Sequence, residues 1–262
     1  MKNHQVLLTN FEEFANQDYL IIIPSKGRAK EIETVQDMFP AGVLFVHEDE
    51  YEEYAKYATC QIITHSKSMG YGQVVNEIFK QCKTHKIRYA AIFDDDKARF
   101  SCLVGNRQRN FSPSQIELAV VNGCQVLEDL DENLFLFSTS SSIIKYEQNK
   151  PFKVGFSLPQ GAMIVRSERI HNFKVGMHYY EDFDWLMEYI KEHRFMVMEN
   201  RMLCISLGKI NEGGCNDFRT SKAEKQARRY IQKKWGQYAS FVKNSSGTIR
   251  PTCRAERQKK ID

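Results

Sequence analysis

The feature that most constrains this chain is an apolar stretch that runs directly into three adjacent carboxylates. Residues 89–93 read Tyr-Ala-Ala-Ile-Phe, and Asp94, Asp95 and Asp96 follow without a break. Five consecutive apolar residues predict a short strand buried on both faces, as in a parallel sheet. Neighbouring carboxylates repel one another unless a cation or a basic side chain lies among them. Ligands of open α/β sheets bind at the carboxyl ends of the strands, so the position predicts a divalent metal with a phosphorylated ligand. A ligand-free acidic turn in water is the alternative.

Length and cysteine usage indicate the class of protein. The 262 residues suffice for one large hydrophobic core or two modest ones. No stretch approaches the roughly 18 apolar residues that a membrane span needs, and we expect no secretory signal because the N-terminus lacks a basic region followed by an apolar core. The seven cysteines are scattered and never form a CxxC pair, which favours free thiols over disulfides or a structural zinc site. The sequence thus predicts a cytoplasmic protein without membrane contact.

The positive charge is concentrated at the C-terminus. The net charge of the chain is +4, whereas residues 219–262 alone carry 13 Lys/Arg against 3 Asp/Glu, which leaves the remainder at −6. A basic tail on an acidic body suggests a polyanionic partner such as nucleic acid. The alternative is a basic helix whose charges are simply solvated.

Upstream of the carboxylates, short apolar runs alternate with helical segments. The runs predicted as strands are 19–23, 43–46, 61–64 and 89–93, and the helical segments between them are 32–38, 48–57 and 74–83. Strands that alternate with helices over short connections predict parallel strands joined by right-handed crossovers. This half is therefore predicted to be Rossmann-like and to bind a nucleotide at the carboxyl edge of its sheet.

Downstream of Asp96 the pattern is less regular. Residues 97–111, which contain three Arg, two Asn and one Gly, are predicted as a long loop, and Ser112 then caps a helix that runs to about Asp129. Further predicted strands, mixed in direction, are 134–137, 162–165, 195–198 and 203–207, and further predicted helices are 180–193 and the basic 221–235. The simplest organisation is one compact domain with a C-terminal extension that ends in an irregular tail.

Common cofactor and catalytic motifs are absent. No GxGxxG follows the first predicted strand and no GxxxxGK[ST] occurs, which argues against a dinucleotide cofactor and against a P-loop. GxSxG, HExxH and spaced His/Cys zinc ligands are absent as well. What remains is a nucleotide-binding α/β half that ends in an acidic cluster suited to a metal.

Four segments, in this order and spacing, resemble glycosyltransferases of the GT-A fold. They are the strand and turn 21–28 (IIIPSKGR), the loop and helix start 70–77 (GYGQVVNE), the DxD-like 93–96 (FDDD) and the acidic pair Glu181-Asp182. The IPSKGR turn, Gly213-Gly214-Cys215 and the sequence KKWG at 233–236 look most similar to the phage TET-associated and base-J-type DNA glycosyltransferases.

The resemblance implies a GT-A fold and a metal-dependent reaction with Mn²⁺ or Mg²⁺. In this reaction a sugar is transferred from a nucleotide-sugar, expected to be a UDP-sugar, to a hydroxyl of a 5-hydroxymethylpyrimidine in DNA. The catalytic domain would span 1–218, with a nucleotide-binding half (1–97) and an acceptor half (98–218), followed by the basic helix and tail (219–262). A phage-encoded enzyme would act in the host cytoplasm. Two alternatives stand: a GT-A enzyme acting on a polysaccharide or small acceptor, and a non-catalytic nucleic-acid-binding protein on the same scaffold.

The resemblance also assigns roles at the donor site. Asp94 and Asp96 are the expected metal and ribose ligands, and Asp95 can substitute for either. Donor contacts are expected from Pro24, Ser25, Lys26, Arg28, Lys67, Gly70, Gly72, Asp94, Asp95, Gly213 and Gly214. Ordinary surface bases and a plain glycine turn are the alternatives for the basic and glycine residues. The family often supplies a late His as a third metal ligand, and this chain has none after His193, which leaves water or Asn216.

Asp182 is the expected catalytic base, with Glu181 or Asp184 sharing or orienting the role. The helix dipole alone also favours acidic residues at a helix start. For the DNA acceptor, cations interleaved with aromatic residues suit phosphate binding and base stacking, and Tyr179 and Tyr180 are candidates for a flipped-base pocket. The expected DNA contacts are Arg99, Arg107, Arg109, Arg228, Arg229, Lys233 and Lys234. A helix with one charged, solvated face is the alternative for the last four.

Overall fold

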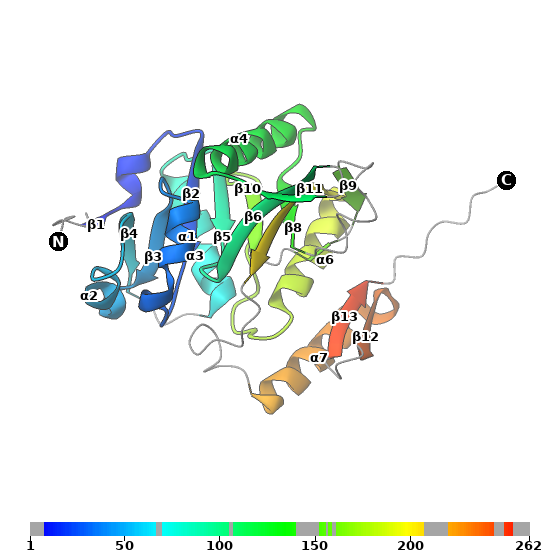
Figure 1. Ribbon diagram of the computed structural model, residues 1–262. Helices are drawn as coiled ribbons and strands as arrows, with labels where there is room; N and C mark the ends of the chain where they lie inside the picture. The colour runs from blue at the N-terminus through cyan, green and yellow to red at the C-terminus, as the bar shows by residue number, and fades with distance from the viewer. Residues whose placement is uncertain are drawn as a thin grey trace.

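A computed structural model of the chain describes residues 8–66, 70–104, 107–139, 152–155, 157–158, 161–206, 220–243 and 249–253. These residues form an eleven-stranded mixed sheet and a separate two-stranded hairpin. Figure 1 shows the sheet at the centre with helices around it, and the C-terminal elements packed below. The site described next lies where strands of the two halves of the sheet meet.

The first half of the sheet is parallel, as the sequence predicts. Its strands are β2 (Tyr19–Pro24), β3 (Val43–His47), β4 (Gln61–His65) and β5 (Tyr89–Phe93). They lie in the order β4-β3-β2-β5, all parallel, and the short β1 (Leu8–Thr9) adds beside β4. Their connections hold α1 (Glu33–Met38), α2 (Tyr51–Tyr54), α3 (Tyr71–Thr84) and the 3-10 turns η1 (Phe11–Phe14), η2 (Ala29–Glu31) and η3 (Glu48–Glu50). Because the strands are parallel, their carboxyl ends share one edge.

The second half of the sheet is mixed, also as predicted. Beyond β5 follow β10 (Ala162–Arg166), β8 (Leu134–Ser138), β11 (Met196–Ser206), β6 (Lys97–Val104) and β7 (Arg107–Asn110), and β9 (Phe152–Gly155) also pairs with β11. β10 runs antiparallel to both β5 and β8, whereas β8 runs parallel to β11. Two predicted strands, 195–198 and 203–207, are one strand, β11, with a register shift against β8 between Glu199 and Leu203. The antiparallel β10 places residue 161 beside the end of β5.

The prediction of a long loop over residues 97–111 is wrong, because β6 and β7 form an antiparallel hairpin there. Polar residues concealed the strands: Lys97 and Ser101 are buried in β6, and all four residues of β7 are exposed at the sheet edge. The irregular tail is also wrong in part, since β12 (Ala239–Lys243) and β13 (Ile249–Cys253) form a second hairpin. Alternation of polar and apolar residues is the usual strand signal, and neither hairpin displays it clearly.

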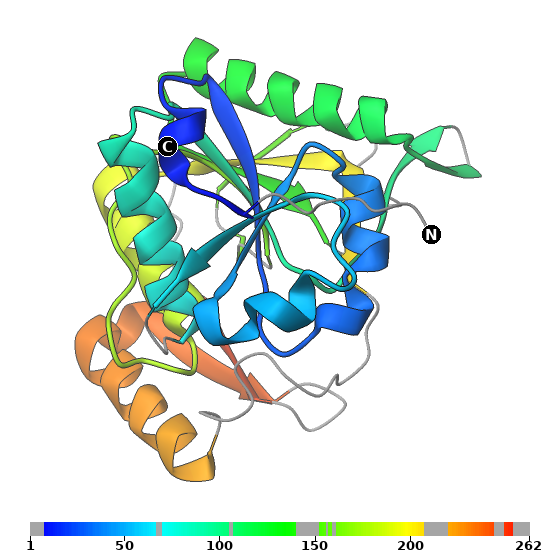
Figure 2. The same ribbon diagram turned by 90° about the vertical axis from the view of Figure 1, so that its left-hand side faces the viewer.

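Helices cover both faces of the sheet, and two separate cores result. On one face α1 and α4 (Pro113–Asp129) pack through residues such as Val35 and Val120. On the other face α3 and α6 (Glu181–His193) pack through residues such as Ile78 and Leu186. Figure 2 shows α3 and α1 on opposite sides of the sheet. The predicted capping box of α4 is confirmed, with Ser112 as N-cap.

The C-terminal unit comprises α7 (Ser221–Trp235), the turn η5 (Gly236–Tyr238), β12 and β13. It packs on α6 through a third core of Phe183, Met187, Ile231, Trp235 and Ala239, and Figure 1 shows α7 beside that helix. The predicted bounds of the basic helix, 221–235, are confirmed. In the described part of the chain, no helix is both long and apolar enough to span a membrane.

Candidate active site

The aspartate triplet lies at the carboxyl end of β5, and each carboxylate has a different environment. Asp95 is 8% exposed and is held by two residues of the turn that follows β2. Ser25 Oγ donates to its Oδ2 over 2.5 Å, and Arg28 Nη1 donates to its Oδ1 over 2.5 Å. The two segments that the sequence singles out, 21–28 and 93–96, therefore meet at Asp95.

The turn that holds Asp95 is itself fixed by α2 and its surroundings. The Tyr54 hydroxyl lies 2.6 Å from Ser25 Oγ and accepts from the Arg28 amide over 3.1 Å. The Gly27 amide donates to Glu50 Oε2 over 3.0 Å, and Gly27 adopts a φ of 68°, a region that favours glycine. The Arg28 guanidinium is thus placed before any ligand arrives, and its Nε is buried without a partner among the described residues.

Asp96 lies on the opposite side of the triplet, beside a buried lysine. The Lys97 side chain is 2% exposed; its Nζ donates to Ser206 Oγ over 2.9 Å and lies 3.7 Å from Asp96 Oδ1. Ser206 in turn donates to Asp96 Oδ1 over 3.0 Å. Sequence reasoning missed Lys97 as part of the site. The available signal for Lys97 was its position directly after the three carboxylates. The prediction of a loop from residue 97 onward concealed it, because Lys97 begins strand β6.

Asp94 packs against a glycine of the antiparallel strand. Its amide donates to the Gly161 carbonyl over 2.9 Å. A Cβ on Gly161 would lie 1.7 Å from Asp94 Oδ2, and Gly161 has a φ of 65°. Asp94 Oδ1 is buried without a well-formed hydrogen bond among the described residues, and the Tyr71 hydroxyl, buried in the same state, interacts with this carboxyl group. A buried carboxylate oxygen without a well-formed hydrogen bond is unfavourable unless a ligand or ion satisfies it.

The protein supplies cations to the triplet, but burial opposes ionisation. Burial raises the pKa of Asp94 above the usual carboxyl range, and the nearby Lys97 ammonium opposes that rise. Burial also raises the pKa of Asp95, to about 6, despite the opposing effects of the Arg28 guanidinium and the Ser25 hydroxyl. Groups with perturbed pKa values in a cleft are functional-site candidates. Arg28 and Lys97 provide the basic partners that adjacent carboxylates require.

The raised pKa of Asp95 predicts a pH dependence of stability. An unfolded Asp titrates near 3.9 and the folded one near 6, so the native state binds this proton more tightly. The contribution of Asp95 is therefore favourable at low pH and is lost as pH rises from about 4 to about 6, by roughly 2 to 3 kcal/mol. Urea unfolding of wild type and Asp95→Asn over this pH interval measures the effect. The variant lacks the titrating carboxyl group, so its free energy of unfolding minus that of wild type should increase as pH rises. A flat difference would contradict the assignment.

The acidic pair Glu181-Asp182 opens α6 near the same carboxylates. Glu181 is 6% exposed, and Asp182 Oδ1 accepts from the Phe183 amide over 2.8 Å. Burial raises the pKa of Tyr71, and the negative charges of Asp94, Asp182 and Glu181 add to the rise. Tyr71 therefore lies within electrostatic range of both acidic groups, at the start of α3.

The loop before α6 is held against α3. Asn76 Nδ2 donates to the Phe173 carbonyl over 2.9 Å, and the Phe173 amide donates back to Asn76 Oδ1 over 2.6 Å. His178 lies next to Gly70, where a Cβ would come within 2.9 Å of the imidazole Nδ1. Sequence reasoning did not indicate that His178, three residues before Glu181, lies beside the predicted donor contact Gly70.

Asp184, expected to share or orient the role of Asp182, has a different set of partners. It is 2% exposed and accepts from Trp235 Nε1 over 2.7 Å and from Lys234 Nζ over 2.8 Å. Lys234 also contacts Glu188 over 2.8 Å. Asp184 and Lys234 therefore dock α7 on α6.

The remaining predicted residues divide between the site and the surface. Pro24 ends β2, Lys26 lies in the turn, and Gly70 and Gly72 lie at the start of α3. Of the predicted DNA contacts, Arg99, Arg107 and Arg109 are exposed on the β6–β7 hairpin, and Arg229 and Lys233 are exposed on α7. Arg228 of α7 pairs with Glu224 over 2.9 Å. Lys67, Gly213, Gly214 and Asn216 lie outside the described residues.

The described residues contain no group of three His, Cys, Asp or Glu side chains placed to hold a metal ion together. Two carboxylates suffice for an ion of the Mg²⁺ type when substrate phosphates and waters complete its coordination. Asp94 Oδ1, which lacks a well-formed hydrogen bond among the described residues, fits such a role, and Asp96 offers a second carboxylate at the other end of the triplet.

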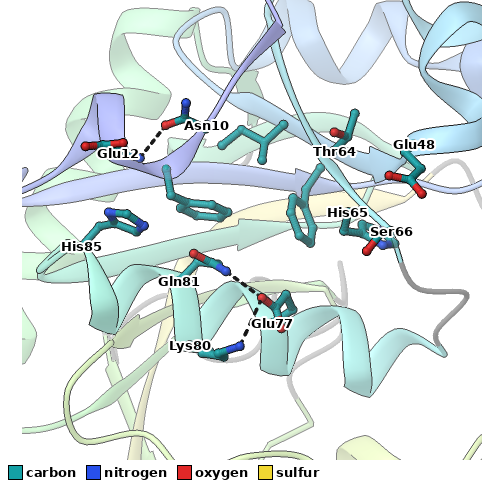
Figure 3. A pocket seen from close by; sticks show the side chains of 13 residues that line it. Asn10, Glu12, Glu48, Thr64, His65, Ser66, Glu77, Lys80, Gln81 and His85 are labelled. Carbon is teal, nitrogen blue, oxygen red and sulfur yellow. Dashed lines mark hydrogen bonds and ion pairs between the residues drawn. The ribbon is translucent and has the colours of Figure 1, made fainter.

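A cavity of about 540 Å³ lies apart from the triplet. Figure 3 shows it between η1, the ends of β3 and β4, and the outer side of α3, with Glu12, His65, Glu77 and His85 around it. Its lining includes none of the three aspartates. The chemistry described above therefore does not depend on this cavity.

Comparison with protein-family models matches residues 19–214 to the family described as TET-Associated Glycosyltransferase. Among solved structures, the chain is similar to a putative nucleotide-diphospho-sugar transferase from Desulfovibrio desulfuricans G20, with 9% identity and a TM-score of 0.42 over 83% of this chain and 98% of that one. It is also similar to a 4-diphosphocytidyl-2C-methyl-D-erythritol synthase from Anaerococcus prevotii, with 13% identity and a TM-score of 0.39 over 83% of this chain and 99% of that one. A search of curated proteins finds no match.

Proposed function

Because this chain belongs to the TET-associated glycosyltransferase family, we propose that it transfers a sugar from a UDP-linked donor to the hydroxyl of a 5-hydroxymethylpyrimidine in DNA, with Mn²⁺ or Mg²⁺. The chain is a glycosyltransferase with a GT-A-like α/β fold. The proposal concerns the metal, the nucleotide and the acceptor. The observation that carries it is the meeting of the Ser25–Arg28 turn with the aspartate triplet at the carboxyl edge of the sheet.

The donor would bind with its nucleoside diphosphate across this edge. Arg28 offers a fixed guanidinium whose Nε has no partner among the described residues, and guanidinium groups suit bidentate contacts with phosphate. Asp94 and Asp96 would hold the metal ion, which when bound neutralises charge on the diphosphate leaving group. Lys97 Nζ lies 3.7 Å from Asp96 Oδ1, and an ammonium group at this place lowers the repulsion among the three carboxylates.

Asp182 would take the proton of the acceptor hydroxyl. It lies at the start of α6, and Tyr71 is in electrostatic range of both Asp182 and Asp94. A general base must reach the hydroxyl that attacks the donor, and both Asp182 and the metal-ligand candidate Asp94 act electrostatically on Tyr71. Glu181, which is more buried, would support the orientation of Asp182.

The β6–β7 hairpin is the proposed surface for DNA. Arg107 and Arg109 are exposed two positions apart on the edge strand β7 and share one face of the hairpin, opposite Val104 and Cys102 of β6, whereas Arg99, exposed on β6, lies on the other face. Arginines at regular spacing on one ribbon suit a phosphate backbone, because such contacts release counterions from DNA. On α7, Arg229 and Lys233 are exposed and would form a second basic surface for DNA.

Transfer itself is the direct test. The chain is incubated with several nucleotide-sugars, Mn²⁺ or Mg²⁺ and hydroxymethylcytosine DNA, and the nucleosides are weighed by mass spectrometry. We expect a mass gain of one sugar on the modified base, dependent on the metal. Sugar transfer to a non-DNA acceptor alone would support the polysaccharide or small-acceptor alternative. No thermal shift with any nucleotide-sugar and Mn²⁺ would favour the non-catalytic alternative.

Variants of the β6–β7 hairpin test the proposed DNA contacts separately. Arg107→Ala with Arg109→Ala should weaken DNA binding and reduce its salt slope by about one for each phosphate that is no longer neutralised. Lys56→Ala is the control, since this exposed lysine pairs with Glu53 far along the chain from the hairpin. Equal affinities for all three proteins across a salt titration would remove the hairpin from the DNA surface.

A further inference from the structure

Two sets of contacts join the C-terminal unit to the start of α6. The first is the anchor at Asp184, which binds Trp235 and Lys234 of α7 and lies 3.5 Å from the Tyr230 hydroxyl. A carboxylate that is 2% exposed and held by an ammonium and an indole fixes the relative position of the two helices. This anchor holds the first turn of α6.

The second set of contacts is centred on Tyr180, the residue just before α6. Its hydroxyl donates to Glu224 Oε1 of α7 over 2.8 Å. Its ring meets the ring of Phe241 in β12 edge to face, with centroids 5.3 Å apart. These contacts direct Tyr180 into the C-terminal unit, which does not favour the flipped-base pocket that the sequence suggested for it.

The backbone at Tyr180 is in an unusual conformation. Its φ of 59° and ψ of 20° place it in the left-handed region, and its side chain makes no capping hydrogen bond. Residues other than glycine adopt this region rarely, and they persist there when the surroundings hold them. The Glu224 carboxylate and the Phe241 ring, both in the C-terminal unit, are among the side-chain partners that hold Tyr180.

Asp182 lies between two residues that the C-terminal unit holds. Tyr180 precedes it by two positions, and Phe183, which follows it, is fully buried in the core shared with Ile231 and Trp235. The Phe183 amide donates to Asp182 Oδ1 over 2.8 Å. The direction of the Asp182 carboxylate therefore depends on how α6 begins.

We propose that Tyr180 is a positioning residue, through which α7 and β12 hold Asp182 in register with the carboxylates of β5. The inference rests on the proposed role of Asp182 as the base. The family match ends at residue 214, so the C-terminal unit lies beyond it and contributes to the site by contact with α6. A base must be held close to its productive geometry, since a shift of about 1 Å can cost a hundredfold in rate.

The test removes one hydroxyl at a time. Tyr180→Phe deletes the hydrogen bond to Glu224 and keeps the ring against Phe241. We expect kcat for sugar transfer to fall about tenfold, with an unchanged KM for the nucleotide-sugar. Glu224→Ala should produce the same loss, and Glu224→Gln, which can still accept the hydroxyl, should restore part of it. Tyr238→Phe is the matched control, because Tyr238 is 52% exposed in the same unit.

A double-mutant cycle with Asp182→Asn separates positioning from general stability. If Tyr180 acts through Asp182, Tyr180→Phe has no further effect on kcat once Asp182 is Asn, whereas a loss of stability would act equally in both backgrounds. Additive losses, or an unchanged kcat in Tyr180→Phe, would overturn the inference while leaving the base in place. Full activity of Asp182→Asn itself would instead remove the proposed base, and the inference with it.

Discussion

Asp94→Asn is expected to lower the rate of sugar transfer by at least about a hundredfold while the protein stays folded. The variant has the size of the wild-type side chain but lacks the charge that would hold a divalent metal. Loss of one group that stabilises developing charge typically costs about 10² to 10³ in rate. Asp94 is selected within the triplet because its Oδ1 is buried without a well-formed hydrogen bond, beside the Tyr71 hydroxyl.

The same substitution should not destabilise the protein. Burial raises the pKa of Asp94, so an ionised carboxylate at this position is disfavoured by burial. A neutral amide carries no such penalty, and the thermal midpoint of Asp94→Asn should match or exceed that of wild type. Functional residues often show this opposition between stability and activity.

Initial rates with the donor and DNA identified in the transfer experiment measure the effect, together with thermal unfolding of each variant. Asp49→Asn is the matched control, because the Asp49 side chain is 84% exposed and distant in sequence from the triplet. Asp96→Asn should also lose transfer and keep DNA binding. A transfer rate within about threefold of wild type in Asp94→Asn would rule out Asp94 as the metal ligand.

Local patterns in the sequence sufficed for the Rossmann-like half of the fold. The runs at 19–23, 43–46 and 89–93 are apolar throughout, and 61–64 is apolar at its two central isoleucines, because both faces of a parallel sheet are covered. All four form parallel strands. The basic helix at 221–235 was equally clear, because its apolar residues recur at helical spacing. Edge and tail hairpins were missed since their strands lack a continuous apolar face.

The site was predictable only where its residues are adjacent in the chain. The triplet and the IPSKGR turn were recognised as segments, and their meeting at Asp95 agrees with the rule for ligand sites at parallel strand ends. The partners of Asp94 and of Tyr180, namely Gly161 and Glu224, lie 67 and 44 positions away. Such pairs depend on strand register and helix docking, which a single sequence does not display.

Gly161→Ala is expected to be the most destabilising small substitution at the site. Gly161 has a φ of 65°, and an added Cβ would lie 1.7 Å from Asp94 Oδ2 and 2.0 Å from its Cγ. The left-handed backbone alone costs about 1 to 2 kcal/mol for a residue with a Cβ. Overpacking against the Asp94 carboxylate adds about 1 to 3 kcal/mol, because Asp94 is itself held by the hydrogen bond from its amide to the Gly161 carbonyl.

Gly176→Ala separates these two contributions. Gly176 has a similar φ of 77°, and an added Cβ there meets nothing within 4 Å among the described residues. Urea unfolding should therefore show a loss of about 1 to 2 kcal/mol for Gly176→Ala and a clearly larger loss for Gly161→Ala. Equal losses would mean that the carboxylate moves aside freely and that Asp94 is not held in place by β10.

The Asp94→Ala background completes the comparison. Once the carboxylate is removed, Gly161→Ala should cost no more than Gly176→Ala, and the difference between backgrounds is the coupling between the two residues. In the Asp94-containing protein, Gly161→Ala should also abolish transfer, because the carboxylate can no longer occupy the position from which it would reach a metal. A glycine on the antiparallel strand β10 then sets the place of a carboxylate on β5, and this links the mixed half of the sheet to the chemistry at the end of the parallel half.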